Sequence, residues 1–130
     1  MQNHKPILEI KDLQIDIPTQ HGHLHPVDNI SFKVYPGKTY ALVGESGSGK
    51  SLTALSILQL LPPQVRCAKH SKILYKGHDL LKFTEAQLRR IRGRKIAMIF
   101  QEPMTALNPV LTIGYQIKEV LARHLNLPRS

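Results

Sequence analysis

The segment "GESGSGKS" (44–51) has the residue types and the spacing that could hold a phosphate group. It follows the apolar run "YALV" and precedes "LTALSILQLL", so a strand before it and a helix after it are expected. It matches the pattern G-x-x-x-x-G-K-[ST]. In that pattern, glycines such as Gly44, Gly47 and Gly49 permit backbone angles that are closed to other residues, so successive N–H groups can point inward at phosphate oxygens.

The residues after the glycines complete the predicted phosphate cradle. A helix beginning near Lys50 would add its positive N-terminal end. Lys50 would reach the β- and γ-phosphates, and the Ser51 hydroxyl would ligate Mg²⁺. The alternative, a glycine- and serine-rich turn that only links a strand to a helix, is far less consistent with this context. The motif thus predicts a P-loop that binds ATP with Mg²⁺, through Gly44, Glu45, Ser46, Gly47, Ser48, Gly49, Lys50, Ser51 and Leu52.

Composition places the chain among ordinary globular proteins. Its 130 residues suffice for one domain, and 42% hydrophobic with 21% charged residues argues against global disorder. A single cysteine, Cys67, excludes an internal disulfide and is typical of a reducing cytosol. The sequence has no apolar run near the roughly 18 residues of a membrane span and no secretion-type N-terminus. We therefore expect a soluble, intracellular chain, with Cys67 as an unreactive packing residue.

The net charge of +9 comes largely from basic residues, which are densest in "RRIRGRK" (89–95). Such a run is compatible with a nucleic-acid or anionic-lipid surface, or with an ordinary solvated basic face. The interleaved aromatic residues of a single-strand binder are missing, so we expect no nucleic acid. The alternating histidines of "HGHLH" (21–25) could share one strand face and bind a metal, but an exposed hairpin turn is the preferred reading.

Hydrophobic periodicity predicts an α/β fold. We expect a helix from about Lys50 that is stopped by Pro62 and Pro63, and a helix over 112–125 capped by Thr112. The first strand changes phase near Lys11 and Asp12, which predicts a bulge. The remaining predicted elements are strands over 7–17, 30–35, 39–43, 72–77 and 95–100, a short helix over 85–92, turns over 19–26 and 36–38, and a loop over 101–109. Of the strands, 39–43 and 95–100 are expected in the middle of a covered sheet.

Two blocks of sequence resemble the ATP-binding subunits of ABC transporters. They are "VDNISFKVYPGKTYALVGESGSGKSLTALSILQLLP" and "IRGRKIAMIFQEPMTALNPVLTIGYQI", and the resemblance runs from about Leu8 to about His124. The nearest branch is the one that imports oligopeptides, dipeptides and nickel. The second block is the more diagnostic, because many NTPases share the first but few continue with "IFQEPMTALNP". The fold implied is an α/β P-loop NTPase core with an N-terminal antiparallel β subdomain.

The resemblance also implies roles and partners. Gln101 would contact Mg²⁺ and the attacking water, so that Ser51 and Gln101 are the metal contacts. The loop from Glu102 to Pro109 would face the coupling helices of the membrane subunits. A second ATPase subunit, identical or different, would complete the assembly on the cytoplasmic face of the inner membrane. Solute identity is not implied, because the ATPase does not touch the solute.

The chain departs from the family pattern in three respects. Ile17 stands where the family usually stacks an aromatic ring on adenine, and Tyr35 and Tyr40 are better placed for core packing. No two of the eight glycines are adjacent, so the signature Leu-Ser-Gly-Gly-Gln is absent from the sequence. No aspartate follows four apolar residues and precedes a glutamate, so the Walker B carboxylates and the switch histidine after them are also absent.

These departures predict that residues 1–130 form a partial ABC ATPase nucleotide-binding domain that binds ATP without hydrolysing it. Hydrolysis needs one carboxylate to orient water and another to hold Mg²⁺ through its shell. Glu102 is a conceivable but disfavoured base, and no catalytic residue is assigned. The alternatives are a non-catalytic interaction or regulatory protein and a small P-loop kinase or GTPase. The sequence carries no acceptor or base-specifying motif for the latter two enzymes.

Overall fold

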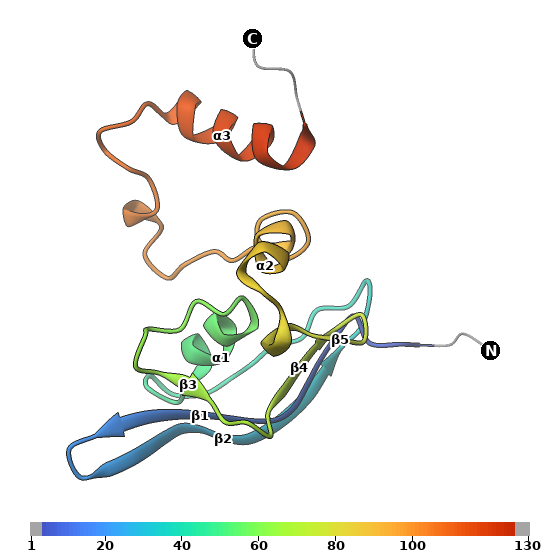
Figure 1. The fold of residues 1–130 in the computed structure, drawn as a ribbon, viewed down its shortest axis with the longest axis vertical. Helices are drawn as coiled ribbons and strands as arrows, with labels where there is room; N and C mark the ends of the chain where they lie inside the picture. Colours follow the sequence, from blue (N-terminus) through green and yellow to red (C-terminus); the bar gives the residue numbers. More distant parts are fainter. Residues whose placement is uncertain (1–3, 127–130) are drawn as a thin grey trace. The chain divides into compact units, whose positions relative to one another are not determined.

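The computed structural model describes residues 4–126, which divide into two compact units. The N-terminal unit extends to Thr84, and the C-terminal unit begins at Glu85. Each unit is described by itself. Figure 1 shows that the N-terminal unit holds every strand of the described chain and the helix α1 (Lys50–Ile57).

The N-terminal unit is built on an antiparallel sheet. Strands β1 (Leu8–Thr19), β2 (Gly22–Val34), β4 (Lys72–Tyr75) and β5 (His78–Asp79) lie in the order β2-β1-β4-β5, and the short β3 (Arg66–Cys67) also pairs with β1. The antiparallel β part of the predicted fold is therefore present. The side chains of the core are Ile10, Leu13, Ile15, Val27, Leu58, Val65, Ile73 and Leu80.

The predicted break in the first strand is confirmed. The pairing of β1 with β2 shifts between Ile10 and Leu13. Asp12 takes a left-handed φ of 48°, and its N–H donates to Ser31 Oγ at 2.8 Å. Because the extra residue reverses the alternation of side chains, Ile10 before the break and Leu13 after it both reach the core.

The turn expected over 19–26 is shorter than predicted. Only Gln20 and His21 separate β1 from β2, and the Thr19 hydroxyl donates to the Gly22 carbonyl at 2.9 Å. His23 and His25 consequently lie on β2, where cross-strand pairing extends the hairpin beyond the Gly and Pro signals of the sequence. Pro26 therefore lies within the strand instead of closing a turn.

Helix α1 begins at Lys50 as predicted but ends at Ile57, well before Pro62 and Pro63. Gln59 takes a left-handed φ of 53°, and its side-chain amide donates to the Leu80 carbonyl at 2.5 Å. A tertiary hydrogen bond to the 3-10 turn η1 (Leu80–Lys82) thus accompanies the end of the helix. The prediction that the prolines stop it is wrong.

The two strands expected in the middle of a covered sheet do not form. Residues 39–43 and 97–100 are in neither helix nor strand, and 95–96 belong to a turn and an isolated bridge between Ile96 and Arg92. Val43 is 89% exposed and Ile99 is 92% exposed. Such strands are stable only when neighbours pair with them and helices cover both faces. Within the described residues no strand pairs with either run, so the predicted α/β core is not seen.

The C-terminal unit contains α2 (Glu85–Ile91), the 3-10 turn η2 (Pro103–Thr105) and α3 (Ile113–Leu125). Both helices agree with the prediction. The Thr112 hydroxyl accepts a hydrogen bond from the Tyr115 N–H at 3.2 Å, which confirms the predicted cap. The apolar stripe of α3 is exposed. Of the helices in residues 4–126, none combines the length and the apolar character required to traverse a lipid bilayer.

Candidate phosphate-binding site

The loop over 44–49 joins the exposed run 39–43 to the start of α1. The Ser48 N–H donates to the Glu45 carbonyl at 3.1 Å, which closes a turn inside the loop. Gly47 and Gly49 have left-handed φ angles of 81° and 92°. Residues with a Cβ pay a steric penalty in this region, so these two positions require glycine, as predicted for a P-loop.

Gly44 is needed for a different reason from the one predicted. Its φ is not in the left-handed region. A Cβ at this position would lie 2.5 Å from Ser48 Oγ and 3.2 Å from Ser48 Cβ. The absence of a side chain therefore allows the two ends of the loop to approach each other, and a special backbone angle is not involved.

Gly49 presses the loop against β2. A Cβ there would lie 2.6 Å from the Pro26 carbonyl oxygen and 2.8 Å from Val27 Cγ2. The Gly49 carbonyl accepts hydrogen bonds from the Thr53 N–H at 2.9 Å and from Thr53 Oγ1 at 2.8 Å. Thr53 is 2% exposed, so this contact ties the loop to the core.

The N-terminus of α1 is open to an anion. Gly49, its N-cap, makes no side-chain capping hydrogen bond, and the first turn of the helix contains no acidic residue. The first N–H groups of a helix have no partner within the helix, and the helix dipole makes this end positive. Ser51 is exposed and Leu52 half-buried on this first turn. The predicted Ser51 hydroxyl is thus accessible to a ligand.

The Lys50 ammonium lies within the loop. Its Nζ donates to the carbonyls of Gly44 at 2.5 Å and Glu45 at 2.6 Å, and to Ser48 Oγ at 3.1 Å. A positive charge is therefore held beside the glycines and the helix N-terminus. The Lys50 ammonium and the first N–H groups of α1 are all hydrogen-bond donors, and the ammonium is positively charged, so they suit phosphate oxygens.

Gln101 belongs to the C-terminal unit, whereas the loop belongs to the N-terminal unit. Because each unit is described by itself, the structure does not bring Gln101 and the loop together, and a contact of Gln101 with Mg²⁺ stays a prediction. Gln101 is exposed. After it, Thr105 Oγ1 donates to the Glu102 carbonyl at 2.9 Å and stabilises the turn η2.

The aromatic rings near the loop pack on each other. The rings of Phe32 and Tyr40 are stacked, with centroids 4.8 Å apart and planes 9° from parallel. Tyr40 is nevertheless 48% exposed and lies outside any strand, so the expectation that it packs in the core is wrong. Ile17, at the position where the family usually has an aromatic ring, faces Leu24 across the hairpin.

Among the histidines of the hairpin, His25 makes polar contacts with Asp16 and with the Gln14 amide, the latter at 3.3 Å. His25 Nδ1 lies 2.5 Å from Asp16 Oδ1, which also accepts a hydrogen bond from the Gln14 amide at 2.9 Å. The Gln14 amide, and after it His25, hold the pKa of Asp16 below its usual range. Within residues 4–126, histidine, cysteine, aspartate and glutamate side chains form no group of three that could hold a metal ion.

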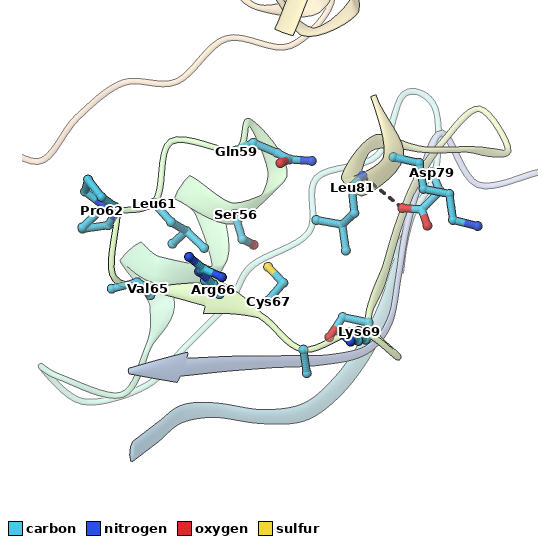
Figure 2. Close-up of a pocket in the computed structure, with 14 residues that line it drawn as sticks. Ser56, Gln59, Leu61, Pro62, Val65, Arg66, Cys67, Lys69, Asp79 and Leu81 are labelled. Carbon is cyan, nitrogen blue, oxygen red and sulfur yellow. Dashed lines mark hydrogen bonds between the residues drawn. The ribbon is translucent and has the colours of Figure 1, made fainter. Parts of the chain in front are cut away.

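A cavity of about 470 Å³ lies elsewhere in the N-terminal unit, between the C-terminal end of α1, β3 and η1 (Figure 2). Cys67 lines it from β3, beside Arg66. Burial, with a smaller contribution from the Asp16 charge, raises the pKa of the Cys67 thiol to about 11. The thiol is therefore protonated at neutral pH, which is the state of an unreactive packing residue.

Two residues important to the loop were not found from the sequence. Thr53 and Pro26 both contact Gly49 at the end of the loop. Thr53 donates two hydrogen bonds to the Gly49 carbonyl, and the Pro26 carbonyl oxygen lies 2.6 Å from the position that a Cβ of residue 49 would take. Thr53 has no distinct signal in the sequence, because the other buried residue of the helix, Ser56, is also polar. Pro26 had no signal, because its contact depends on the pairing of β2 with β1.

A glycine-bearing loop with left-handed backbone angles, followed by a helix with an open N-terminus, defines a P-loop nucleotide-binding protein. The family described as "ABC transporter" matches residues 27–126. The chain therefore belongs to the ABC transporter family, within which this segment is the P-loop NTPase domain.

The chain is similar in sequence to several known proteins over nearly its whole length. It is 45% identical over 124 residues to the dipeptide transport ATP-binding protein DppD of Bacillus subtilis (strain 168), covering 95% of this chain and 37% of that protein. It is 44% identical over 124 residues to the oligopeptide transport ATP-binding protein OppD of the same organism, covering 95% of this chain and 35% of that protein. It is 48% identical over 122 residues to a putative peptide import ATP-binding protein of Brucella abortus (strain 2308), covering 94% of this chain and 36% of that protein. The chain spans little more than a third of the length of these relatives.

Proposed function

We propose that this chain binds Mg-ATP through residues 44–52 and is the nucleotide-binding portion of an importer of peptides. The observation that carries the proposal is the loop itself. Two left-handed glycines, an uncapped α1 N-terminus and the Lys50 ammonium all lie on one short segment. Each would contribute positive potential or N–H donors to a polyphosphate.

Different residues of the loop would contact different parts of the ligand. The N–H groups of 45–51 would donate to the β- and γ-phosphates, and Lys50 would exchange its carbonyl partners for phosphate oxygens. The exposed Ser51 hydroxyl would be a ligand of Mg²⁺, with Gln101 as a second contact. Magnesium would neutralise charge on the phosphates when bound.

Peptide import is supported by the relatives, which are named as dipeptide transport, oligopeptide transport and peptide import ATP-binding proteins. By the same resemblance, the chain would act with membrane subunits that contact residues 102–109 and with a second ATPase subunit. It would lie on the cytoplasmic face of the membrane. Nickel would be the alternative solute, because the resembling branch also includes nickel importers.

We further propose that residues 1–130 alone hold ATP without hydrolysing it. The sequence offers no pair of carboxylates after an apolar strand that could orient water and hold the Mg²⁺ shell. Phosphate release above the uncatalysed background from these residues alone would contradict this part of the proposal.

The test of ATP binding is a calorimetric titration of Mg-ATP into the chain and into two lysine variants. Lys50→Ala removes hydrogen bonds to a charged ligand, so we expect the affinity to fall roughly 10- to 100-fold. Lys38→Ala is the matched control, because Lys38 is exposed and lies in the turn before the loop. Equal affinities of wild type and Lys50→Ala would contradict the assigned site.

A further inference from the structure

One side chain holds the segment that precedes α3. Gln116 Oε1 accepts a hydrogen bond from the Asn108 N–H at 2.9 Å. Gln116 Nε2 donates to the Asn108 carbonyl at 3.0 Å and to the Leu111 carbonyl at 3.0 Å, and lies 3.4 Å from the Thr112 carbonyl. A single amide therefore connects both ends of the segment 108–112 to the helix.

The contact with Asn108 requires an amide. Gln116 offers one acceptor and two donors, and it pairs with the N–H and the C=O of the same residue as a neighbouring strand would. A glutamate would keep an acceptor for the Asn108 N–H, but it would lose both donors. Its negative charge would also lie beside three carbonyl oxygens. An apolar residue of similar size would make none of these hydrogen bonds.

Two further hydrogen bonds lie within the segment: the Val110 N–H donates to Asn108 Oδ1 at 3.0 Å, and the Leu111 N–H donates to the Asn108 carbonyl at 3.3 Å. Besides the Thr112 cap, it is the Gln116 side chain that ties the segment to α3.

Packing adds little to these hydrogen bonds. Of the α3 residues, only Gln116 and His124 are half-buried, and the others are exposed. Among the described residues of the C-terminal unit, Leu88 of α2 is the only buried apolar side chain. Packing therefore contributes little here, and the shape of the segment depends on hydrogen bonds.

Gln116 also forms part of a cavity of about 620 Å³ between the segment and α3. Leu111 of the segment and Leu107 just before it line this cavity on one side, and Val120 and Leu121 of the helix line it on the other. Because Gln116 joins the two walls, its hydrogen bonds set the distance between them.

We propose that Gln116 is a positioning residue, which makes the segment 108–112 and α3 move as one piece. The inference rests on the proposed function, because the segment continues from the Gln101 region that would meet the membrane subunits. In the assembled importer, a displacement of this segment is then transmitted directly to α3. Loss of Gln116 should disconnect transport from nucleotide binding and leave the nucleotide site itself intact.

The structural part is tested by amide hydrogen exchange on the chain, with Gln116→Leu beside the control Lys118→Ala. Lys118 is an exposed residue on the same helix. In Gln116→Leu we expect the Asn108 amide to exchange about tenfold faster, while the amides of 117–125 keep their protection. An unchanged Asn108 amide would overturn the proposal. Loss of protection along the whole of α3 would also overturn it, since Gln116 would then only support the helix.

The functional part is tested in the importer assembled with the full-length subunit. We expect Gln116→Leu and Gln116→Glu to bind Mg-ATP within about twofold of wild type and to import solute about tenfold more slowly. The glutamate variant separates the two explanations, because a carboxylate in the first turns of α3 favours the helix dipole. If Gln116 only stabilised the helix, Gln116→Glu would transport normally, and the proposal would fail.

The two proposals fail in different ways. If the wild-type protein does not bind Mg-ATP, the proposed function is wrong. If it binds Mg-ATP and transports, and both Gln116 variants transport equally well, the proposed function stands and the role of Gln116 is wrong.

Discussion

The three loop glycines are required for different physical reasons. Gly47 needs its backbone angle, since nothing lies within 4 Å of where its Cβ would be. Gly44 needs only space, beside Ser48. Gly49 needs both, because it has a left-handed φ and lies against the Pro26 carbonyl. One sequence motif thus combines three separate constraints, which substitutions can distinguish.

Alanine substitutions at Gly47 and Gly49 should differ in their effect on stability. Gly47→Ala should lower the free energy of unfolding by about 1 kcal/mol, which is the cost of a left-handed residue with a Cβ. Gly49→Ala adds a collision with backbone and should cost about 3 kcal/mol or more. Urea unfolding measures both, and Gly47→Ala serves as the matched control. Equal losses would mean that the loop is not pressed against β2.

The Cys67 thiol should make stability depend on pH in the alkaline range. Its pKa rises from an ordinary 9.0 to about 11 in the folded chain. Between these values the folded protein keeps a proton that the unfolded chain has lost. The stabilising contribution is therefore complete below pH 9 and is lost as the pH rises toward 11.

Urea unfolding at a series of pH values, compared between wild type and Cys67→Ala, isolates this contribution from that of the other side chains. The wild type should lose stability more steeply above pH 9. Parallel curves for the two proteins would show that the folded thiol titrates at its ordinary pKa.

Among the helices, strands and turns, the sequence predicted correctly those features that depend on residues close in sequence. The left-handed Gly47 and Gly49 of the loop and the Thr112 cap depend on neighbours in sequence, and each is seen in the structure. The break at Asp12 was visible as a change of phase in the sequence, although in the structure it is accompanied by a hydrogen bond to the distant Ser31.

The end of α1 was missed because it coincides with a hydrogen bond from Gln59 to Leu80, a residue distant in sequence. The hairpin turn was misjudged because cross-strand pairing overrode the Gly22 and Pro26 signals.

The runs 39–43 and 95–100 were misassigned for the same reason at a larger distance. Their apolar composition is typical of buried strands, but composition does not supply a pairing partner. In the candidate site, the loop residues were predictable from spacing. The contact of Gly49 with Pro26 was not, since it depends on how the loop and β2 meet.

The cap of α3 provides a prediction for a single element. Thr112→Ala removes the acceptor for the Tyr115 N–H, which typically costs about 1 kcal/mol of helix stability. Because the apolar face of α3 is exposed, the loss should appear as fraying of this helix, detected by faster exchange of the Tyr115 amide. Thr112→Ser keeps the hydroxyl and should behave like wild type. Fraying in both variants would show that the methyl group, and not the cap, supports the helix.

At the scale of the whole molecule, the buried apolar side chains are distributed unequally. Among the described residues, eight of the nine buried hydrophobic side chains lie in the N-terminal unit, and the ninth, Leu88, lies in the C-terminal unit. Burial of apolar surface is the main source of folding free energy. The two units should therefore differ in stability although they share one chain.

We expect the amides of β1 and β4 to exchange at least roughly tenfold more slowly than those of α3 in the native chain. The difference follows from the number of buried side chains that must be exposed before each segment opens. Mass spectrometry of exchange over residues 4–126 measures it directly. Equal protection of α3 and β1 would show that the chain unfolds as a single cooperative unit.

The stacked rings of Phe32 and Tyr40 give the chain an optical property. Tryptophan is absent, so the emission of the four tyrosines is not masked. Tyr40 lies in the run that leads directly into Gly44, and its ring rests on a residue of β2. Any movement of the loop away from that strand would separate the two rings and alter the ultraviolet absorption and fluorescence of Tyr40. Tyr40 is thus an intrinsic fluorophore next to the loop over 44–49. Movement of the loop can be followed through tyrosine fluorescence without an attached label.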